Sequence, residues 1–213
     1  VAQMVANEFQ IDIDAIKITA TSTGKVPNTS ATAASSGTDL NGMAAQAAAR
    51  TIRLRIRDFL AAQHDLPGDA VRFAAGCVHL GDTASLSFAD AVEAAYLGRV
   101  SLSSTGFYAT PKIHWDRDRG QGRPFFYYAY GAAVTEIAID MLTGENRILR
   151  TDIIHDAGKS LNPAIDIGQI EGGFVQGAGW LTTEELVWDD AGRLRTYAPS
   201  TYNTPACADR PAI

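Results

Sequence analysis

Side chains that could bind a ligand gather in two segments, and the first is "NTSATAASSGTD" at residues 28 to 39. Six of its twelve residues carry a hydroxyl and three are alanine. A helix-forming stretch follows, so backbone N–H groups, the positive end of a helix dipole and the hydroxyls of Ser35, Ser36 and Thr38 would suit an anion such as a phosphate. An exposed, capped loop is the commoner explanation of such a pattern, because the segment matches neither GxxxxGK[ST] nor GxGxxG.

The second segment is "GQIEGGFVQGAG" at residues 168 to 179, inside an otherwise good helix pattern. Four of its glycines each cost roughly 1 kcal/mol relative to alanine in a helix interior. Either another backbone or a flat ligand comes close to this helix, or the helix is shorter than the pattern suggests. The amides of Gln169 and Gln176 can donate and accept hydrogen bonds, which suits the edge of a heterocycle, and both could equally be solvated.

Other reactive residue types lack a supporting pattern. His155 beside Asp156 could be a general base, although a hydrogen-bonded structural histidine is the commoner case. The four histidines have neither HxH nor HExxH spacing, and the chain contains no GxSxG nucleophile motif. Helix-surface carboxylates are commoner than catalytic ones, so Glu171, Glu184 and Glu185 are not assigned as acid or base.

Periodicity predicts the elements that would position these segments in the first half of the chain. Apolar residues at helical spacing indicate a helix over residues 1 to 9, and partial alternation indicates a strand from Ile16 to Thr21. A long amphipathic helix is predicted over residues 40 to 63, with Thr38 or Asp39 as its N-cap. A short hairpin within residues 71 to 87 and a helix capped by Ser87 and ended by Gly98 follow.

The second half has more strand signals. Residues 100 to 111 are strand-like, residues 114 to 124 form a charged loop, and residues 125 to 156 contain two long strands joined at "TGEN". A helix then begins with Asn162 as cap and Pro163 at its first position, and a hairpin is predicted at "DDAG". The fold class is α+β, in one partial domain with a possible subdivision near residue 99 (1 to 98 and 99 to 213), and both ends look truncated.

Composition excludes some classes of function. The net charge is -6 with acidic residues spread along the chain, so neither nucleic acid nor a membrane surface is an expected partner. No stretch approaches the ~20 apolar residues of a membrane span, and residues 1 to 9 lack the features of a signal peptide. Cys77 and Cys207 are far apart and fit two reduced thiols of a cytoplasmic protein.

Three stretches carry a resemblance to the molybdenum hydroxylase (xanthine oxidase) family. These are "TSTGKVPNTSATAASSGTDLNG", "RVSLSSTGFYATP", and the long run from "YGAAVTEIAID" through "NPAIDIGQIEGGFVQGAGWLTTEEL" to "APSTYNTP". Nearly the whole chain is covered. Within the family, "TAAS" and "TGFYATP" look more like the molybdenum-cofactor (large) subunits of xanthine dehydrogenases than like aldehyde oxidases. The resemblance implies a fragment of the C-terminal molybdopterin-binding region.

The resemblance also implies roles for individual residues. Ala33 and Ala34 would line the space beside molybdenum and substrate, where larger side chains would obstruct a purine. Ser35, Thr38 and the loop amides would bind the pterin cofactor from one side, and Gln169 from the other. The family often has a serine at the position of Gly37, so one hydroxyl contact is replaced or lost here. No protein ligand to the metal is implied.

The family's catalytic glutamate lies in a "GVGE"- or "AVGE"-type motif, which these 213 residues do not contain, so no catalytic residue is assigned. The implied reaction is the hydroxylation of hypoxanthine and xanthine to urate in purine catabolism, with water as the oxygen source. Electrons would pass through [2Fe-2S] iron-sulfur clusters and FAD to NAD. The implied partners are an iron-sulfur/FAD subunit or domain within a homodimer or heterotetramer, and the segment alone would be inactive. Another molybdenum hydroxylase, acting on an aldehyde or N-heterocycle, and a non-catalytic scaffold or interface piece are the alternatives.

Overall fold

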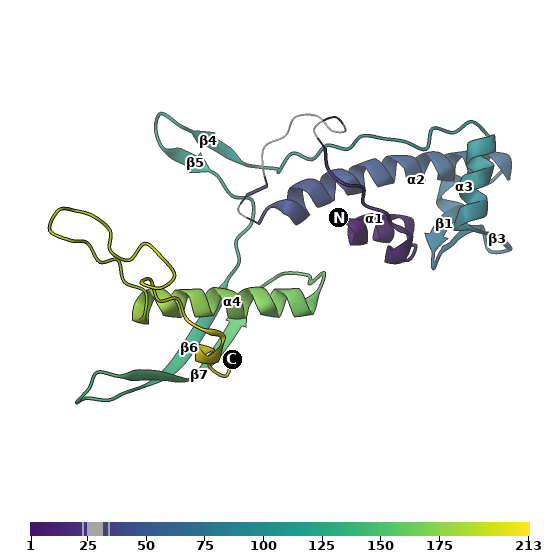
Figure 1. Ribbon diagram of the computed structural model, residues 1–213. Coiled ribbons are helices and arrows are strands. Elements are labelled where there is room, and N and C mark those ends of the chain that lie inside the picture. Colours follow the sequence, from purple (N-terminus) through teal and green to yellow (C-terminus); the bar gives the residue numbers. More distant parts are fainter. Residues whose placement is uncertain (23, 25–31, 34) are drawn as a thin grey trace. The chain divides into compact units, whose positions relative to one another are not determined.

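The computed structural model describes residues 1–22, 24, 32–33 and 35–213. The chain divides into two compact units, Val1–Phe126 and Tyr127–Ile213, and each is described by itself (Figure 1). The change in sequence character near residue 99 lies inside the first unit. Helices and antiparallel strands are mixed in the described residues, which confirms the α+β class. None of the helices described is both long and apolar enough to cross a membrane.

The first unit is built around one long helix. Its elements in chain order are α1 (Ala2–Phe9), η1 (Ile13–Ala15), the π-helix η2 (Gly37–Gly42), α2 (Met43–Gln63), η3 (Gly68–Ala70), β1 (Val71–Ala74), β2 (Cys77–Leu80), β3 (Ala84–Ser87), α3 (Phe88–Leu97), β4 (His114–Asp116) and β5 (Gln121–Arg123). Helix α1 packs against α2, and α2 also contacts α3 and β1. The expected N-terminal helix and the expected helix from Ser87 to Gly98 are confirmed, and the Ser87 side chain accepts a hydrogen bond from the Asp90 amide.

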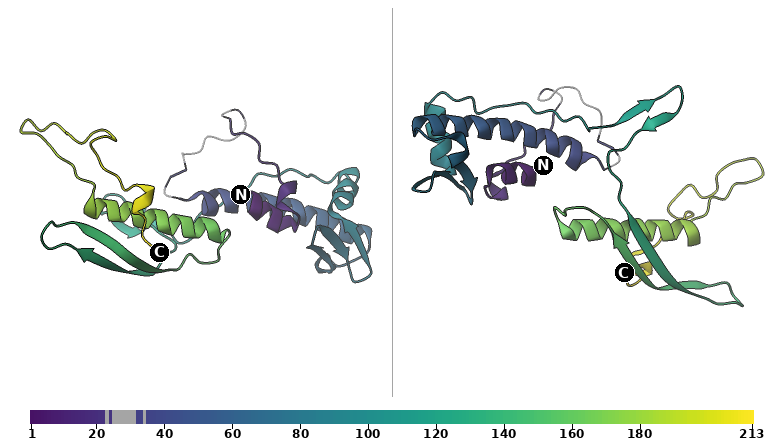
Figure 2. Two further views of the ribbon diagram at one scale, coloured as in Figure 1. Left: turned by 60° about the horizontal axis from the view of Figure 1, so that its bottom comes forward. Right: turned by 180° about the vertical axis from the view of Figure 1, so that it is seen from behind.

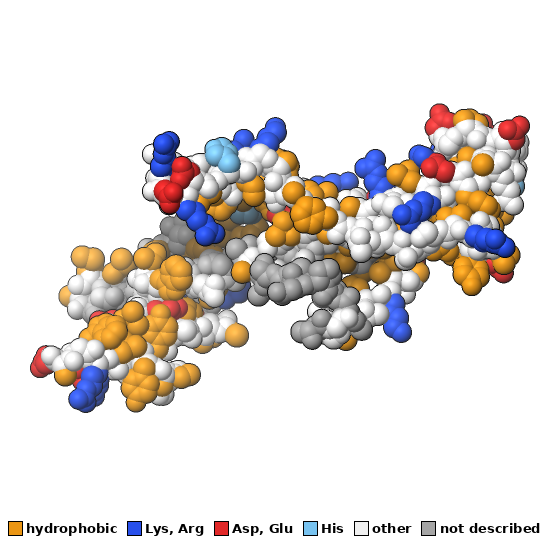
Figure 3. Space-filling model, turned by 90° about the horizontal axis from the view of Figure 1, so that it is seen from above, with side chains coloured by type: hydrophobic (Ala, Val, Ile, Leu, Met, Phe, Trp, Pro, Cys, Tyr) orange, Lys and Arg blue, Asp and Glu red, His pale blue; other side chains and the backbone are white. Residues whose placement is uncertain are grey.

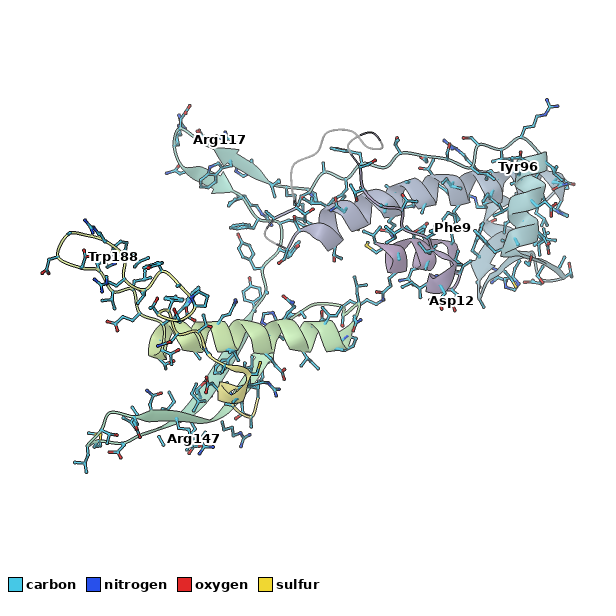
Figure 4. All side chains as sticks on the ribbon, in the orientation of Figure 1. Phe9, Asp12, Tyr96, Arg117, Arg147 and Trp188 are labelled. Atoms are coloured by element: carbon cyan, nitrogen blue, oxygen red, sulfur yellow. The ribbon has the colours of Figure 1, made fainter. Side chains whose placement is uncertain are left out.

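The core of this unit lies where the second half of α2 meets α3 and a small sheet. Strands β1, β2 and β3 form an antiparallel meander, so the predicted hairpin is confirmed and gains a third strand. Ile56, Leu60 and Val78 are at most 1% exposed there. At the edge of the core, the rings of Phe9 and Phe88 meet edge-on at 5.4 Å between centroids; Phe9 ends α1 (Figure 4).

The second unit has a long hairpin and one long helix. Its elements are β6 (Gly131–Ile139), β7 (Asn146–His155), α4 (Pro163–Thr182) and η4 (Cys207–Asp209). Strands β6 and β7 pair antiparallel, as predicted, with a register shift between Glu136 and Ile137. The chain after η4 touches the other edge of β7, where the Thr151 amide donates to the Ala212 carbonyl at 3.0 Å.

Many large apolar side chains of this second unit are exposed, and Figure 3 shows hydrophobic side chains on one face of the molecule. Among them, Ile154 on β7 is 80% exposed and Leu181 on α4 is 88% exposed. The only side chain fully buried in the described part of this unit is the polar Thr151, whose hydroxyl is hydrogen-bonded to that of Thr135 at 3.2 Å. The unit is therefore organised by backbone pairing more than by an apolar core.

Four expectations about local structure are wrong. Residues 16 to 22 form no strand, because none of the described strand pairings includes them, and Ile18 is 65% exposed. Residues 100 to 111 are not a strand either, since no strand pairing in the described residues includes them. The charged loop is instead the β4–β5 hairpin (Figure 4). The "DDAG" hairpin, by contrast, is confirmed: its turn is closed by one antiparallel bridge between Trp188 and Leu194.

The fourth error concerns the N-terminus of the long helix. Thr38 and Asp39 are not its N-cap, because helical structure already begins at Gly37, and the capping position before it is Ser36, whose side chain makes no cap hydrogen bond. The Asp39 carboxylate instead accepts a hydrogen bond from the adjacent Leu40 amide at 2.9 Å. A wide π-turn has displaced the expected start by one residue or more.

Candidate functional site

Two described residues of the loop ahead of α2, Ser35 and Thr38, present exposed hydroxyls. Ser35 has a left-handed backbone, with φ at 54°, and Thr38 lies in the first turn of η2; both residues are exposed. Neither hydroxyl is hydrogen-bonded to any described residue, whereas Ser36 Oγ donates to the Ala33 carbonyl at 2.9 Å. A non-glycine residue in this conformation costs of order 1–3 kcal/mol and is concentrated at binding and active sites. Among the described residues of the loop, Ser35 and Thr38 thus hold hydroxyls that are available to a ligand.

A π-helix forms the end of this loop. The Leu40 amide donates to the Ser36 carbonyl at 3.0 Å, and the Met43 amide donates to the carbonyls of both Asp39 and Leu40. The loop also closes on itself, because Asn41 Nδ2 donates to Thr32 Oγ1 at 3.3 Å. Single π-turns are rare and frequently mark functional sites. Hydroxyls at the positive end of a long helix can hold a phosphate or another anion.

The glycine-rich segment is one continuous helix, α4, so the possibility of a shorter helix is excluded. Asn162 caps it as predicted, accepting a hydrogen bond from the Ile165 amide, and Pro163 occupies its first position. Gly179 is closely packed, because an added Cβ would lie 2.6 Å from Pro205 Cδ. Added Cβ atoms at Gly172, Gly173 and Gly177 would meet nothing within 4 Å in the described residues.

Gln169 is exposed on α4, and its amide makes no hydrogen bond to a described residue. Gly173 and Gly177 follow it at intervals of four residues, so they lie on the same side of the helix. The backbone on that side is accessible, and a flat ligand could approach it while hydrogen-bonding to the amide. This is a property of the helix alone and does not depend on the other unit.

A groove of the second unit lies on a different side of α4. It has a volume of about 1230 Å³ and is bordered by the β6–β7 hairpin, η4 and three α4 residues, Val175, Ala178 and Thr182. At ~100° per residue these three side chains are roughly 180° to 240° around the helix from Gln169. The groove therefore does not include the predicted cofactor contact.

The acidic residues of α4 and the following loop have structural partners. Arg210 forms an ion pair with Glu171, and the Tyr202 hydroxyl donates to Glu184 Oε2 at 2.5 Å. The hydrogen bond to Glu184 raises the pKa of the Tyr202 hydroxyl above its usual value near 10. These contacts tie the C-terminal segment to α4 at Glu171 and to the loop after α4 at Glu184. They agree with leaving Glu171 and Glu184 unassigned as catalytic groups.

The structure brings only part of the predicted site together. Ala33, Ser35 and Thr38 are neighbours in the loop of the first unit, whereas Gln169 belongs to the second unit. Ala34 lies outside the described residues. His155 is exposed at the end of β7, and its ring has no hydrogen bond to a described residue. No group of three or more His, Cys, Asp or Glu side chains forms a metal site in the part of the chain described.

Sequence reasoning missed two residues that shape the loop. Asn41 ties the helix start to Thr32, and Gly42 lets α1 approach, since an added Cβ there would lie 2.3 Å from Met4 Sδ. The dipeptide "NG" inside an otherwise strong helix pattern indicates that these two positions have a special role, because both residues are poor helix formers.

Comparison with known proteins supplies the remaining observation. A family model for the molybdopterin cofactor-binding domain matches residues 1–211. Xanthine dehydrogenase/oxidase of Felis catus is 46% identical over 210 residues, 99% of this chain and 14% of that protein. Aldehyde oxidase 2 of Cavia porcellus is 42% identical over 209 residues, 98% of this chain and 14% of that protein. The chain thus spans 14% of the length of these curated relatives.

Solved structures share the fold. Quinoline 2-oxidoreductase from Pseudomonas putida 86 superposes with a TM-score of 0.81 and 26% identity, over 100% of this chain and 26% of that chain. Cu,Mo-CO dehydrogenase gives a TM-score of 0.82 at 21% identity, over 99% of this chain and 26% of that chain, a likeness of fold alone.

Proposed function

Because this chain belongs to the family of molybdopterin cofactor-binding domains, we propose that it supplies part of the molybdenum-cofactor site of a xanthine dehydrogenase. The complete enzyme would hydroxylate hypoxanthine and xanthine to urate, with oxygen from water. Electrons would leave through iron-sulfur clusters and FAD to NAD, carried by other parts of the protein. The identity to xanthine dehydrogenase/oxidase over almost the whole chain is the observation that carries this proposal.

Ser35, Thr38 and Gln169 would hold the pterin cofactor. Their side chains fit this role because all three are exposed and make no hydrogen bond to a described residue. Hydroxyls and an amide can bind the pterin edge and its phosphate, and the start of η2 would add the favourable end of a helix dipole. The metal would be held by the cofactor itself. Once bound, the cofactor would supply the oxidation chemistry, which side chains cannot provide.

Ala33 and Ala34 would border the substrate. Ala33 is exposed, and its carbonyl accepts the Ser36 hydroxyl, which fixes the turn. A methyl side chain leaves room for a planar purine, and the left-handed Ser35 turns the chain sharply after this pair. The alanines would thus exclude water and define shape without chemistry of their own.

An aldehyde- or N-heterocycle-oxidising enzyme is the second candidate, favoured by the 42% identity to aldehyde oxidase 2. The test is to purify the complete protein, measure its molybdenum content, and compare NAD reduction with xanthine and with an aromatic aldehyde. Xanthine-dependent NAD reduction by molybdenum-containing protein is expected. Turnover of the aldehyde with no response to xanthine would reject the substrate assignment, and protein without molybdopterin would reject the cofactor role.

A further inference from the structure

Gly106 lies directly against the backbone of α2. An added Cβ at Gly106 would lie 1.9 Å from the Ala44 carbonyl oxygen and 2.8 Å from the Ala48 amide nitrogen. Both atoms belong to the helix backbone, which cannot move aside as a flexible side chain could. Glycine is therefore required here for close approach. Ala44 is the second residue of α2, and α2 begins immediately after η2.

Arg55 fixes the other end of the same segment. Its Nη1 donates to the carbonyls of Ser101 at 3.1 Å and Ser103 at 2.9 Å. From Ala44 to Arg55 the helix rises about 16 Å, and the five residue steps from Ser101 to Gly106 span about the same length in an extended chain. Figures 1 and 2 show this segment running along α2. Residues 101–106 are thus a strap laid along the first half of the helix.

Two elements, α1 and the strap, both hold the start of α2 in place. Gly42, the last residue of η2, receives the Met4 side chain of α1, and Gly106 contacts the next turn. The core of this unit is formed by the other half of α2, at Ile56 and Leu60. The helix start, and with it Ser35 and Thr38, lies outside that core cluster and is held by these contacts, while Leu102 ties the strap itself to the core.

We propose that Gly106 and Arg55 are positioning residues for the cofactor loop: the strap of residues 101–106 fixes η2 so that Ser35 and Thr38 meet the cofactor. This inference rests on the proposed function. The strap would act through α2 and would not touch the reacting atoms. It gives the "TGFY" motif a structural reason, since any side chain at its glycine would lift the strap off the helix.

The test uses the complete protein with Gly106→Ala and Arg55→Met, and Arg50→Met as the matched control. Arg50 is exposed on the same helix and has no hydrogen bond to a described residue. Amide hydrogen exchange is measured for residues 36–42 in cofactor-free protein and compared with residues 77–80 of the core. Molybdenum per polypeptide is measured separately. Arg55→Lys serves as the conservative variant, because an ammonium group can also donate to both carbonyls.

Both strap variants should raise exchange at residues 36–42 about tenfold, leave exchange at residues 77–80 unchanged, and lower molybdenum content. Arg50→Met should change neither quantity, and Arg55→Lys should recover much of both. Unchanged exchange at residues 36–42, or faster exchange with full molybdenum content, would overturn the proposal. If the unsubstituted protein never holds molybdopterin, the proposed function fails instead, while the exchange result still shows whether the strap fixes η2.

Discussion

Glu8 and Arg53 form an ion pair between α1 and α2, with Arg53 Nε donating to Glu8 Oε1 at 2.8 Å. The Glu8 side chain is only 11% exposed and also accepts a hydrogen bond from Gln46 at 3.3 Å. The Arg53 guanidinium lies 5.8 Å from the centre of the Phe73 ring. One carboxylate thus fixes the short helix that packs against Gly42.

Glu8→Ala should loosen α1 from α2, since Arg53 and Gln46 would lose a shared acceptor. A hydrogen bond to a charged group is worth about 1.5–3 kcal/mol when partly buried. Hydrogen exchange in residues 1–9 should therefore accelerate by about tenfold or more. Glu93→Ala, a change of the same kind on α3, is the control. Equal exchange in the two variants would show that the ion pair does not hold α1.

Gly179→Ala and Gly172→Ala should have opposite effects on α4. At Gly179 the new methyl group would meet Pro205, so the C-terminal segment should detach locally. At Gly172 the methyl group meets nothing described, and alanine should strengthen the helix by about 1 kcal/mol. Proteolysis within residues 199–213 reads out the first effect, and hydrogen exchange in residues 163–182 the second. Slower exchange and intact attachment in both variants would contradict the packing described for Gly179.

The Tyr202 hydroxyl should titrate at a higher pH than that of an ordinary tyrosine. It donates a hydrogen bond to Glu184, and this bond raises the pKa of Tyr202. The hydrogen-bonded phenol contributes stability fully below the usual value near 10, and this contribution is lost as pH rises through the raised value. Difference titration of tyrosinate absorbance between the unsubstituted protein and Tyr202→Phe isolates this group. Glu184→Gln should move the transition back toward 10. A Tyr202 transition unaffected by Glu184→Gln would argue against the pair.

Local sequence rules predicted those helices and strands that are specified by residues of the same segment, such as a capping residue or an alternating apolar pattern. Ser87 and Asn162 cap their helices as expected, and the two long strands were recognised from their alternation. The predicted strand at Ile16 failed because pairing depends on a neighbouring segment, which local pattern does not contain. The π-turn before Met43 was not predicted, because local pattern does not include its contacts with Met4 of α1 and with Thr32.

The candidate site was predictable only through resemblance. Residue chemistry alone left "NTSATAASSGTD" as either an anion-binding loop or an ordinary exposed loop. The left-handed conformation of Ser35 and the contact between Gly106 and α2 are set by tertiary structure, so no local rule could supply them. The assignments of Ala33, Ala34, Ser35, Thr38 and Gln169 remain predictions.

The most direct test of the central claim is the molybdopterin content of Ser35→Ala and Gln169→Ala, each made in the complete protein. Loss of one hydrogen bond to a charged or polar group of the cofactor should increase its dissociation by about tenfold. Ser85→Ala and Gln63→Ala remove exposed side chains of the same types and serve as controls. We expect both site variants to lose cofactor on gel filtration while both controls retain it. Full, equal cofactor content in all four variants would contradict the assignment of this chain's residues to the cofactor site.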